Sequence, residues 1–519
     1  MNLTLRQKIG QMISAGFPSP FVDEQALTIV KELGIGNFFI FAKNIESAQQ
    51  ITRLNYELKK LVYDNCGVHP FISIDQEGGA VSRIVDGAAL FPGAMALGAT
   101  DGKYAYECGK NCAEILRAMG FTTTASPVMD VNIEPLNPII GSRAYSDNPE
   151  TVSRIGREMM RGLKDGGLIA TVKHFPGHGN VKSDSHLTLP VNDTKKEILE
   201  NTEWKPFYDA FSAGADSVMS AHVLFTDVDR ERPATLSRAF LTDLLRDKMH
   251  FTGVAVTDCM EMQGVKAIYG SGEAAVMAIE AGCDLMTVSH SLEAAREVVE
   301  AIEKAVRTGR IPEERIDLSV SRILALKEKY GFMGEIACGD EKAKALAFDK
   351  EKMDLHLKAA KESITLVSDH GGAEKLRYAN NITFVSPRSF SLNNAEEDNG
   401  EPLSFARTCV RMLGGKAYDI ALNEFDEKIA SEILESDADA VVLGVYNARF
   451  RDGQKAYIDA LSKTDKPFAV VMLGAPYDAG CIGKCDSLIA AYEYTNLSVK
   501  ALIESFVSGK YEGKLPVGI

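Results

Sequence analysis

The stretch 169–179, IATVKHFPGHG, begins as a short apolar run and ends in a lysine, a histidine, a proline and two glycines. Its apolar and β-branched residues are typical of a buried strand. Pro176, Gly177 and Gly179 forbid a regular helix, so the chain must leave the strand as a loop. Lys173 and His174 are therefore expected at the carboxyl end of a core strand.

The same pattern recurs through the first two thirds of the chain. Further short apolar runs occupy residues 37–41, 71–75, 121–125, 217–223, 254–258 and 285–288. Amphipathic helical segments separate them, and the clearest, 291–308, is followed by Gly309 and Pro312. Repeated strand–helix units favour a parallel sheet, and seven or eight of them favour a closed barrel. We therefore predict an α/β fold in which residues 1–335 form a (β/α)8 TIM-like barrel.

The alternation of strands and helices pauses after this barrel. The stretch 327–352 is charged and lacks a strand pattern, and we predict that 336–352 is the interdomain linker. Strand patterns resume at 363–368, 382–386, 440–445, 468–473 and 488–492. Residues 353–519 are therefore expected to form a smaller C-terminal α/β domain with an open layered sheet.

Composition limits the partners and the compartment. The 519 residues include 57 basic and 72 acidic side chains, and the net charge of −15 disfavours nucleic acid and anionic membranes as partners. No run of ~18 apolar residues predicts a membrane-spanning helix. The first residues lack a signal-peptide pattern, and nine thinly spread cysteines suit free thiols in a reducing compartment. We expect a cytoplasmic protein without membrane insertion, or a secreted one if a leader has been removed.

Chemically active side chains collect at the predicted strand ends. Asp75, Lys173 with His174, His222 and Asp258 each end or follow an apolar run. In a parallel barrel these ends share one rim, where the following loops build the active site. A single aspartate there could merely cap a helix, but four such strand ends on one rim favour a site.

The loop 173–190, KHFPGHGNVKSDSHLTLP, contains His174, His178 and His186. A metal site is one interpretation, but the helical HExxH spacing and a nearby thiolate are missing. The other interpretation is acid–base chemistry, because Asp184 lies two residues before His186 and an aspartate can orient an imidazole. We favour the second interpretation and expect neither a metal nor an organic cofactor.

Several motifs together resemble a known family. The following segments occur in this order along the chain: IDQEGGAVSRI (74–84), PVMDVN (127–132), IGSRAYSDNPE (140–150), KHFPGHG (173–179) followed by DSH (184–186), MSAHV (219–223), GVAVTDCMEM (253–262) and GKLPV (513–517). They resemble the segments of family 3 glycoside hydrolases, in their β-N-acetylglucosaminidase branch. The resemblance spans residues of about 5 to 335 in register and extends to a C-terminal domain like that of the two-domain members.

The resemblance implies a retaining exo-β-N-acetylglucosaminidase. Asp258 would be the nucleophile that forms a glycosyl-enzyme, and His186 with its dyad partner Asp184 would be the general acid and base. The hydroxyls of terminal N-acetylglucosamine would be held by Asp75, Arg83, Arg143, Lys173 and His174. The substrate would be an N-acetylglucosamine-containing glycan or muropeptide from peptidoglycan.

Other interpretations stay open. The same residues could support a phosphorylase, in which phosphate attacks the glycosyl-enzyme, or a sugar-binding protein without catalysis. Asp130 and His222 are expected to support the site from behind, and Glu77 is expected to hold a turn. Arg449 and its neighbours in 446–451 are expected in a solvated loop. The C-terminal domain could pack on the barrel, extend the substrate groove or form a homodimer.

Overall fold

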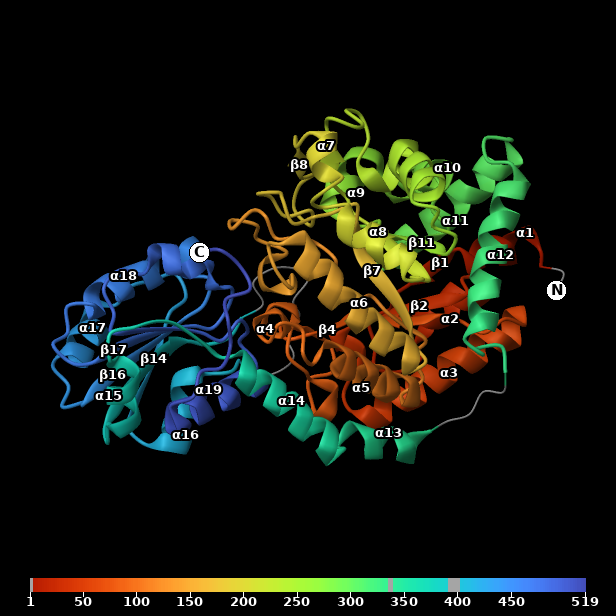
Figure 1. Cartoon of the computed structure of the whole chain (residues 1–519). Coiled ribbons are helices and arrows are strands. Elements are labelled where there is room, and N and C mark those ends of the chain that lie inside the picture. Colours follow the sequence, from red (N-terminus) through yellow and green to blue (C-terminus); the bar gives the residue numbers. More distant parts are fainter. Residues whose placement is uncertain (1–2, 335–338, 391–401) are drawn as a thin grey trace.

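The computed structural model describes residues 3–334, 339–390 and 402–519. Two units lie side by side: a barrel, and a smaller layered domain drawn in blue (Figure 1). The barrel is closed, in the order β1-β12-β11-β9-β7-β6-β3-β2, and neighbouring strands are parallel. This confirms the predicted (β/α) barrel. Its strands are β1 (Ile13–Ala15), β2 (Asn37–Ile40), β3 (Ile72–Ile74), β6 (Thr123–Thr124), β7 (Ile169–Phe175), β9 (Ser217–Ser220), β11 (Val254–Cys259) and β12 (Leu285–Val288).

Helices surround these strands on the outside of the barrel (Figure 1). The predicted helix 291–308 is α11, where the Ser291 side chain accepts the backbone N–H of Ala294 as the N-cap. The barrel helices are α1 (Leu5–Gln11), α2 (Glu24–Lys31), α3 (Ala48–Cys66), α4 (Ala94–Ala99), α5 (Ala105–Ala118), α6 (Pro149–Asp165), α7 (Lys196–Leu199), α8 (Lys205–Ser212), Ala239–Lys248, α9 (Gln263–Tyr269), α10 (Ser271–Ala281), α11 (Leu292–Arg307) and α12 (Glu313–Lys329).

Strand β1 was not predicted from the sequence. It has three residues, too few to show a period of two, and it exists because β12 and β2 pair with it on either side. Ile13 and Ala15 are fully buried, so this short strand closes the barrel.

The C-terminal domain contains a six-stranded sheet in the order β13-β18-β17-β16-β14-β15. Strand β13 is antiparallel to β18 and the other neighbours are parallel, so the predicted second α/β sheet is confirmed. The missed strand β15 pairs only with β14, and an edge strand needs no continuous apolar pattern. The elements are β13 (Thr365–Asp369), α15 (Gly372–Tyr378), β14 (Ile382–Pro387), α16 (Phe405–Leu413), β15 (Lys416–Ile420), α17 (Glu427–Leu434), β16 (Ala440–Val445), α18 (Asp452–Leu461), β17 (Phe468–Met472), β18 (Ser487–Ala490) and α19 (Asn496–Ser508).

Two helices occupy the segment between the domains. Within the predicted linker lie α13 (Asp340–Ala347) and the start of α14 (Lys350–Ser363). Helix α13 packs on α3 and α5 of the barrel, whereas α14 packs on both α4 and α19. The connection is therefore a packed helical pair, and the domain limits 1–335 and 353–519 stay a prediction.

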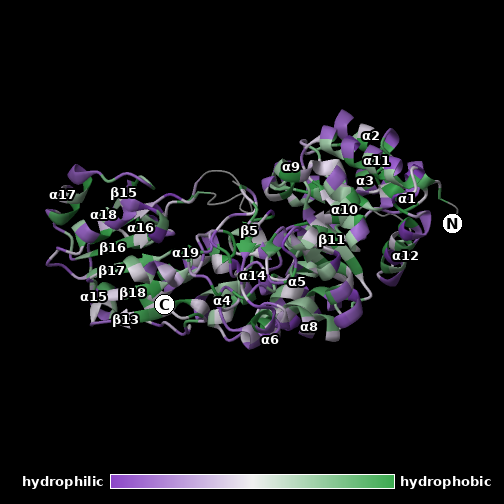
Figure 2. Cartoon of the chain, turned by 90° about the horizontal axis from the view of Figure 1, so that it is seen from above, coloured by the Kyte–Doolittle hydropathy of each residue, from purple (hydrophilic) through white to green (hydrophobic). Residues whose placement is uncertain are grey.

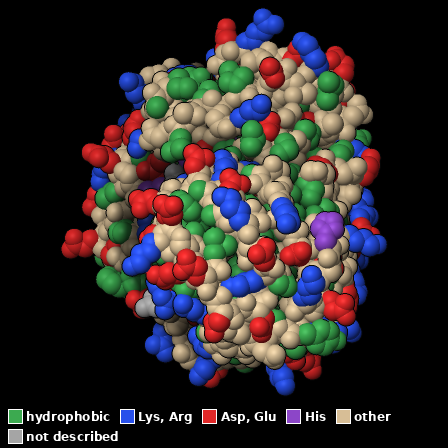
Figure 3. All heavy atoms as spheres, turned by 90° about the vertical axis from the view of Figure 1, so that its left-hand side faces the viewer, with side chains coloured by type: hydrophobic (Ala, Val, Ile, Leu, Met, Phe, Trp, Pro, Cys, Tyr) green, Lys and Arg blue, Asp and Glu red, His purple; other side chains and the backbone are tan. Residues whose placement is uncertain are grey.

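Apolar residues fill the sheet of the C-terminal domain, while hydrophilic residues gather on its outer loops (Figure 2). On the face seen in Figure 3, acidic and basic side chains are interspersed. The expectation of a solvated Arg449 is wrong, because its side chain is 8% exposed and forms an ion pair with buried Asp478. The described cysteines are all free thiols, and Cys338 lies outside the described residues. None of the described helices is long and apolar enough to cross a membrane.

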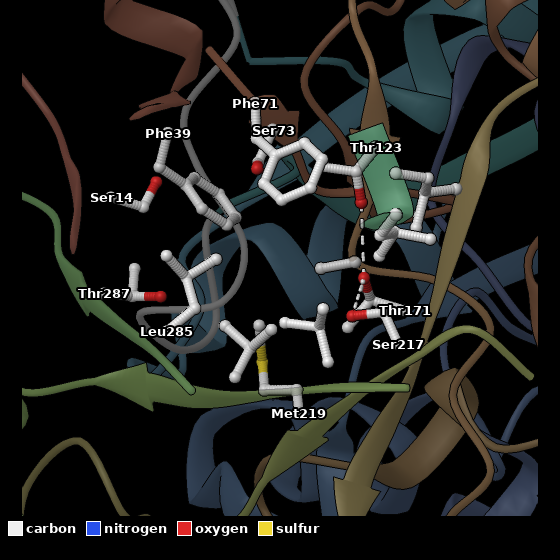
Figure 4. Close-up of a pocket in the computed structure, with 15 residues that line it drawn as sticks. Ser14, Phe39, Phe71, Ser73, Thr123, Thr171, Ser217, Met219, Leu285 and Thr287 are labelled. Atoms are coloured by element: carbon white, nitrogen blue, oxygen red, sulfur yellow. Dashed lines mark hydrogen bonds between the residues drawn. The ribbon is translucent and has the colours of Figure 1, made fainter. Parts of the chain in front are cut away.

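The interior of the barrel is packed and contains hydroxyl groups (Figure 4). Ser14, Ser73, Thr123, Thr171, Ser217 and Thr287 line a gap of about 30 Å³. Thr171 donates a hydrogen bond of 3.0 Å to Ser217 and lies 3.2 Å from the Thr123 hydroxyl. Such a gap holds a water molecule but not a sugar, so any substrate must bind at the barrel mouth.

Candidate active site

A cavity of about 590 Å³ opens at the carboxyl ends of the barrel strands. The barrel brings together residues that lie as far apart in sequence as Asp75 and Asp258. Asp184 does not line the cavity, but it lies directly behind His186. The predicted residues that line the cavity are Asp75, Arg83, Arg143, Lys173, His174, His186 and Asp258.

A buried network of charges forms one side of the cavity. The Lys173 ammonium on β7 lies 2.7 Å from Asp75 Oδ1 and 2.6 Å from Glu77 Oε1. Arg143 donates two hydrogen bonds to the Glu77 carboxylate, of 2.9 Å from Nε and 2.8 Å from Nη2. Burial disfavours the charged forms of both Glu77 and Lys173. The cations of Arg143 and Lys173 nevertheless lower the pKa of Glu77, and the carboxylates of Asp75 and Glu77 raise the pKa of Lys173. The network therefore stays ionised and presents fixed donors to a polar ligand.

A small hairpin carries part of this network. It consists of β4 (Gln76–Gly78) and β5 (Val81–Ser82), which pair antiparallel directly after β3. The buried Gln76 side chain accepts the backbone N–H groups of Arg83 and Ile84, and thereby fixes the end of the hairpin. Arg83 Nη2 then lies 3.2 Å from Asp75 Oδ2.

His174 is oriented by a fully buried carboxylate. Its Nδ1 lies 2.6 Å from Asp130 Oδ2, and the backbone N–H of His178 donates to Asp130 Oδ1 at 2.7 Å. Burial opposes ionisation of Asp130, but the His174 ring and the hydrogen bonds keep its pKa below the usual value. Burial also lowers the pKa of His178 to about 4, which keeps that ring neutral. Asp130 thus lies behind His174, where it was expected as a support.

Asp258 lies near the end of β11, with its carboxylate toward the cavity. The backbone N–H of Cys259 donates to Asp258 Oδ1 at 2.7 Å. Burial works against the charge, but the rings of His222, His174 and His186 and this hydrogen bond lower the pKa of Asp258 to about 2. The carboxylate is therefore ionised at neutral pH, as an attacking group must be. His222 contacts Thr235 and the carbonyl of Cys259, and so supports Asp258 from behind.

Asp184 and His186 form a pair on the loop after β7. His186 Nδ1 lies 2.8 Å from Asp184 Oδ1, and the same oxygen accepts the His186 backbone N–H at 2.8 Å. The Asp184 pKa is lowered, because these bonds outweigh burial. Helix α9 supports the loop, since Gly264 donates to the carbonyl of Ser185. A side chain at Gly264 would lie 2.9 Å from that carbonyl oxygen, so the close approach requires glycine.

Sequence reasoning missed other residues that line the cavity. Glu77 was expected only to hold a turn, whereas it pairs with both Arg143 and Lys173. Its place beside Lys173 and Arg143 depends on three separate segments, which no local pattern shows. At another part of the wall, the rings of Phe41 and His290 lie with their centroids 5.0 Å apart and are tilted by 43°. The remaining lining includes Phe39, Val81, Ile139, Ile140, Leu187, Met219, Cys259, Glu261, Met262 and Gln263.

The histidines of this site do not form a metal-binding group. Within the described ranges, no set of three or more His, Cys, Asp or Glu side chains could hold a metal ion. The contacts of His174 and His186 are instead to single aspartates, an arrangement suited to proton transfer and hydrogen bonding.

Comparison with known proteins agrees with this geometry. Residues 4–326, more than half of the chain, match the glycosyl hydrolase family 3 N terminal domain. The solved structure of a glycoside hydrolase family 3 β-N-acetylglucosaminidase from Paenibacillus sp. str. FPU-7 is 35% identical, covers 100% of this chain and 99% of that one, and superimposes with a TM-score of 0.91.

Two curated relatives are β-hexosaminidases. The β-hexosaminidase A of Pseudoalteromonas piscicida is 26% identical over 95% of this chain and 90% of its own length. The β-hexosaminidase of Chromobacterium violaceum is 34% identical over 52% of this chain and 75% of its own length. The chain therefore belongs to glycosyl hydrolase family 3, and it is a glycoside hydrolase.

Proposed function

We propose that this chain is a retaining exo-β-N-acetylglucosaminidase that removes non-reducing terminal N-acetylglucosamine. The observation that carries the proposal is the pairing of His186 with Asp184 at the same cavity as the ionised Asp258. The β-hexosaminidase names of the relatives support the choice of sugar.

In the first step, a carboxylate oxygen of Asp258 attacks the anomeric carbon. The bond from that carbon to the leaving oxygen breaks, and the imidazolium of His186 gives its proton to that oxygen. Asp184 stabilises the imidazolium before the transfer. The result is a covalent glycosyl-enzyme and a free aglycone.

In the second step, neutral His186 takes a proton from water as the water oxygen attacks the anomeric carbon. The bond to Asp258 breaks, and the released sugar keeps its original anomeric configuration. Asp75, Arg83, Arg143, Lys173 and His174 hold the sugar hydroxyls during both steps. Ion pairs hold the donors among them in place, so little reorganisation is needed when the sugar binds.

The test of the nucleophile uses Asp258→Ala and a fluorosugar trap. The variant should fold and should not hydrolyse an aryl N-acetyl-β-glucosaminide. Mass spectrometry of the wild-type enzyme with a fluorinated N-acetylglucosaminide should locate the label on Asp258. Full activity of the variant, or labelling elsewhere, would refute this role. A sugar-binding protein without catalysis would show neither turnover nor label.

The acid role of His186 has a separate test. His186→Ala should impair hydrolysis of a natural disaccharide far more than that of an activated aryl substrate, because a good leaving group needs little protonation. Equal losses on both substrates would contradict the role.

The natural source and setting of the substrate are also proposals. We infer peptidoglycan fragments or muropeptides as substrates and a cytoplasmic role in cell-wall turnover. Release of N-acetylglucosamine from purified muropeptides tests the first, and cell fractionation tests the second. Sedimentation of the purified chain tests whether it forms a homodimer.

Phosphorolysis is the second candidate for the same site. It is favoured by the imidazole of His186, since a neutral ring repels an incoming phosphate less than a carboxylate does. A rate that depends on phosphate, with release of a sugar 1-phosphate, would establish phosphorolysis. Hydrolysis that is independent of phosphate would exclude it.

A further inference from the structure

The barrel and the C-terminal domain share a buried apolar contact at α4. Met95, Ala96 and Ala99 of this barrel helix belong to the same buried cluster as Val470 and Tyr492 of the C-terminal domain. The two domains are therefore packed together immediately beside the hairpin that carries Glu77 (Figure 1). Two polar side chains of the C-terminal domain reach the barrel at this contact.

The first is Glu493, which follows β18 and is 3% exposed. Its Oε2 accepts the backbone N–H of Gly93 at 2.6 Å, and its Oε1 accepts the Thr495 hydroxyl at 3.1 Å. Burial raises the pKa of Glu493 to about 7, although both donors favour the carboxylate. A buried acid with a contact of this kind, contributed across a domain boundary, calls for a function beyond filling space.

Glu493 also contacts the hairpin directly. A side chain at Gly79 would lie 2.5 Å from Glu493 Oε2 and 2.9 Å from the Gly93 α-carbon. Gly79 has φ +58° and lies at the turn between β4 and β5, two residues after Glu77. The Glu493 carboxylate therefore rests against the turn of the hairpin, on the side away from the cavity, since it does not line the cavity.

The second side chain is Tyr477. Its hydroxyl accepts a hydrogen bond of 2.9 Å from Asn132 Nδ2. The carbonyl oxygen of the same Asn132 side chain accepts the backbone N–H of Gly141, where the turn Gly141–Arg143 begins. The Arg449 guanidinium carbon lies 5.7 Å from the centroid of the Tyr477 ring, and Arg449 is itself paired with Asp478. These contacts hold the Tyr477 ring in place.

The two contacts converge on one ion pair. Glu493 rests on the segment that carries Glu77, and Tyr477 holds the segment that carries Arg143. Glu77 and Arg143 are joined by two hydrogen bonds at the wall of the cavity. Neither Glu493 nor Tyr477 lines that cavity.

We propose that Glu493 and Tyr477 are positioning residues, through which the C-terminal domain holds the Glu77–Arg143 pair in the geometry that binds the terminal sugar. The inference rests on the proposed function, because it assumes that Arg143 binds a sugar hydroxyl. Among the described residues, Glu77 and Arg143 form no hydrogen bond with Asp184 or His186, so displacement of the pair weakens sugar binding in the ground state and transition state alike. Such uniform binding changes KM and leaves kcat nearly constant.

The test uses the full chain and two variants that remove one contact each. Glu493→Ala should raise KM for an aryl N-acetyl-β-glucosaminide about tenfold, and Tyr477→Phe about threefold, with kcat within about twofold of wild type. Glu493→Gln should restore a KM close to wild type, because its amide can accept from Gly93 and donate to Thr495. Unchanged KM in both Glu493→Ala and Tyr477→Phe would overturn the proposal.

A matched control and a measurement without substrate complete the test. Asp147→Ala removes another bond between the domains, from the Gly518 N–H at 2.8 Å, and should leave KM unchanged. Hydrogen exchange should quicken at residues 76–84 in Glu493→Ala and at 139–144 in Tyr477→Phe. Unchanged hydrogen exchange in both variants would overturn the proposal. If the wild type hydrolyses no N-acetylglucosaminide, that finding refutes the proposed function alone, and the exchange measurement still tests the contacts.

Discussion

The buried carboxylate of Glu77 offers a quantitative test of the charge network. Glu77 is 6% exposed and faces Lys173 and Arg143, and Asp75 is the other carboxylate that pairs with Lys173. Glu77→Gln keeps the shape but removes one of two negative charges that face these cations. Breaking a buried ion pair from one side typically costs about 3–5 kcal/mol.

This cost converts into a thermal shift. At ~2.1 cal/mol/K per residue, a barrel of roughly 320 residues has an unfolding entropy of ~0.7 kcal/mol/K near its midpoint. A loss of about 3–5 kcal/mol therefore lowers the midpoint of barrel unfolding by about 4–7 °C. We also expect KM to rise, because Arg143 loses one of the two Glu77 oxygens that accept its hydrogen bonds.

Differential scanning calorimetry and steady-state kinetics measure the two effects. The matched control is Glu158→Gln, which breaks an exposed pair with Arg161 on α6; Glu158 is 44% exposed. Such a pair is worth about 0–1 kcal/mol, so the control should shift the midpoint by about 1.4 °C or less. If Glu77→Gln shifts the midpoint no more than the control, the network does not stabilise the barrel as we argue.

Two further predictions concern the loop that carries His186 and the contact between the domains. Gly264→Ala places a methyl group 2.9 Å from the Ser185 carbonyl oxygen and 3.0 Å from that of Thr188, so the loop with His186 must shift. We expect kcat on a disaccharide to fall about tenfold and kcat on an aryl substrate to fall much less. Equal losses on both substrates would contradict this reasoning. The pKa of Glu493 rises from 4.5 to about 7 on folding, so its stabilising effect is complete below pH 4.5 and is lost as pH rises through 7. Urea unfolding of Glu493→Gln should therefore gain up to ~3 kcal/mol relative to wild type between pH 4.5 and 8, and a constant difference across that range would refute the shift.

Much of the barrel could be predicted because its strands are short apolar runs that end in charged or polar side chains. The runs at 169–174 and 254–258 correspond to β7 and β11, and their terminal Lys173 and Asp258 reach one cavity. The missed strands β1 and β15 lack such a signal. Strand β1 has three residues, and β15 lies at a sheet edge, so the pairing partners rather than the local pattern define them.

The candidate site also has a part that the local sequence predicts and a part that only the fold brings together. The dyad of Asp184 and His186 is local, because two residues of spacing suffice to bring the carboxylate within 2.8 Å of the ring. The ion pairs of Glu77 could not be predicted, since Arg143 lies in the segment after β6 and Lys173 lies on β7, and each pair forms only when the barrel closes. Arg449 likewise was expected in solvent, but its side chain pairs with buried Asp478 and lies over the ring of Tyr477.

The sequence by itself determined the strand–helix alternation, the residues at the strand ends and the family they resemble, because these depend on local periodicity and on short spacings. Only the tertiary structure decided which charges pair, and that the C-terminal domain packs against the barrel at α4 and Gly93. The Glu77–Arg143 pair and the Glu493 contact join residues 66 and 400 positions apart. Contacts of that range form only when whole layers pack, since burial and desolvation select the partners after the chain has folded.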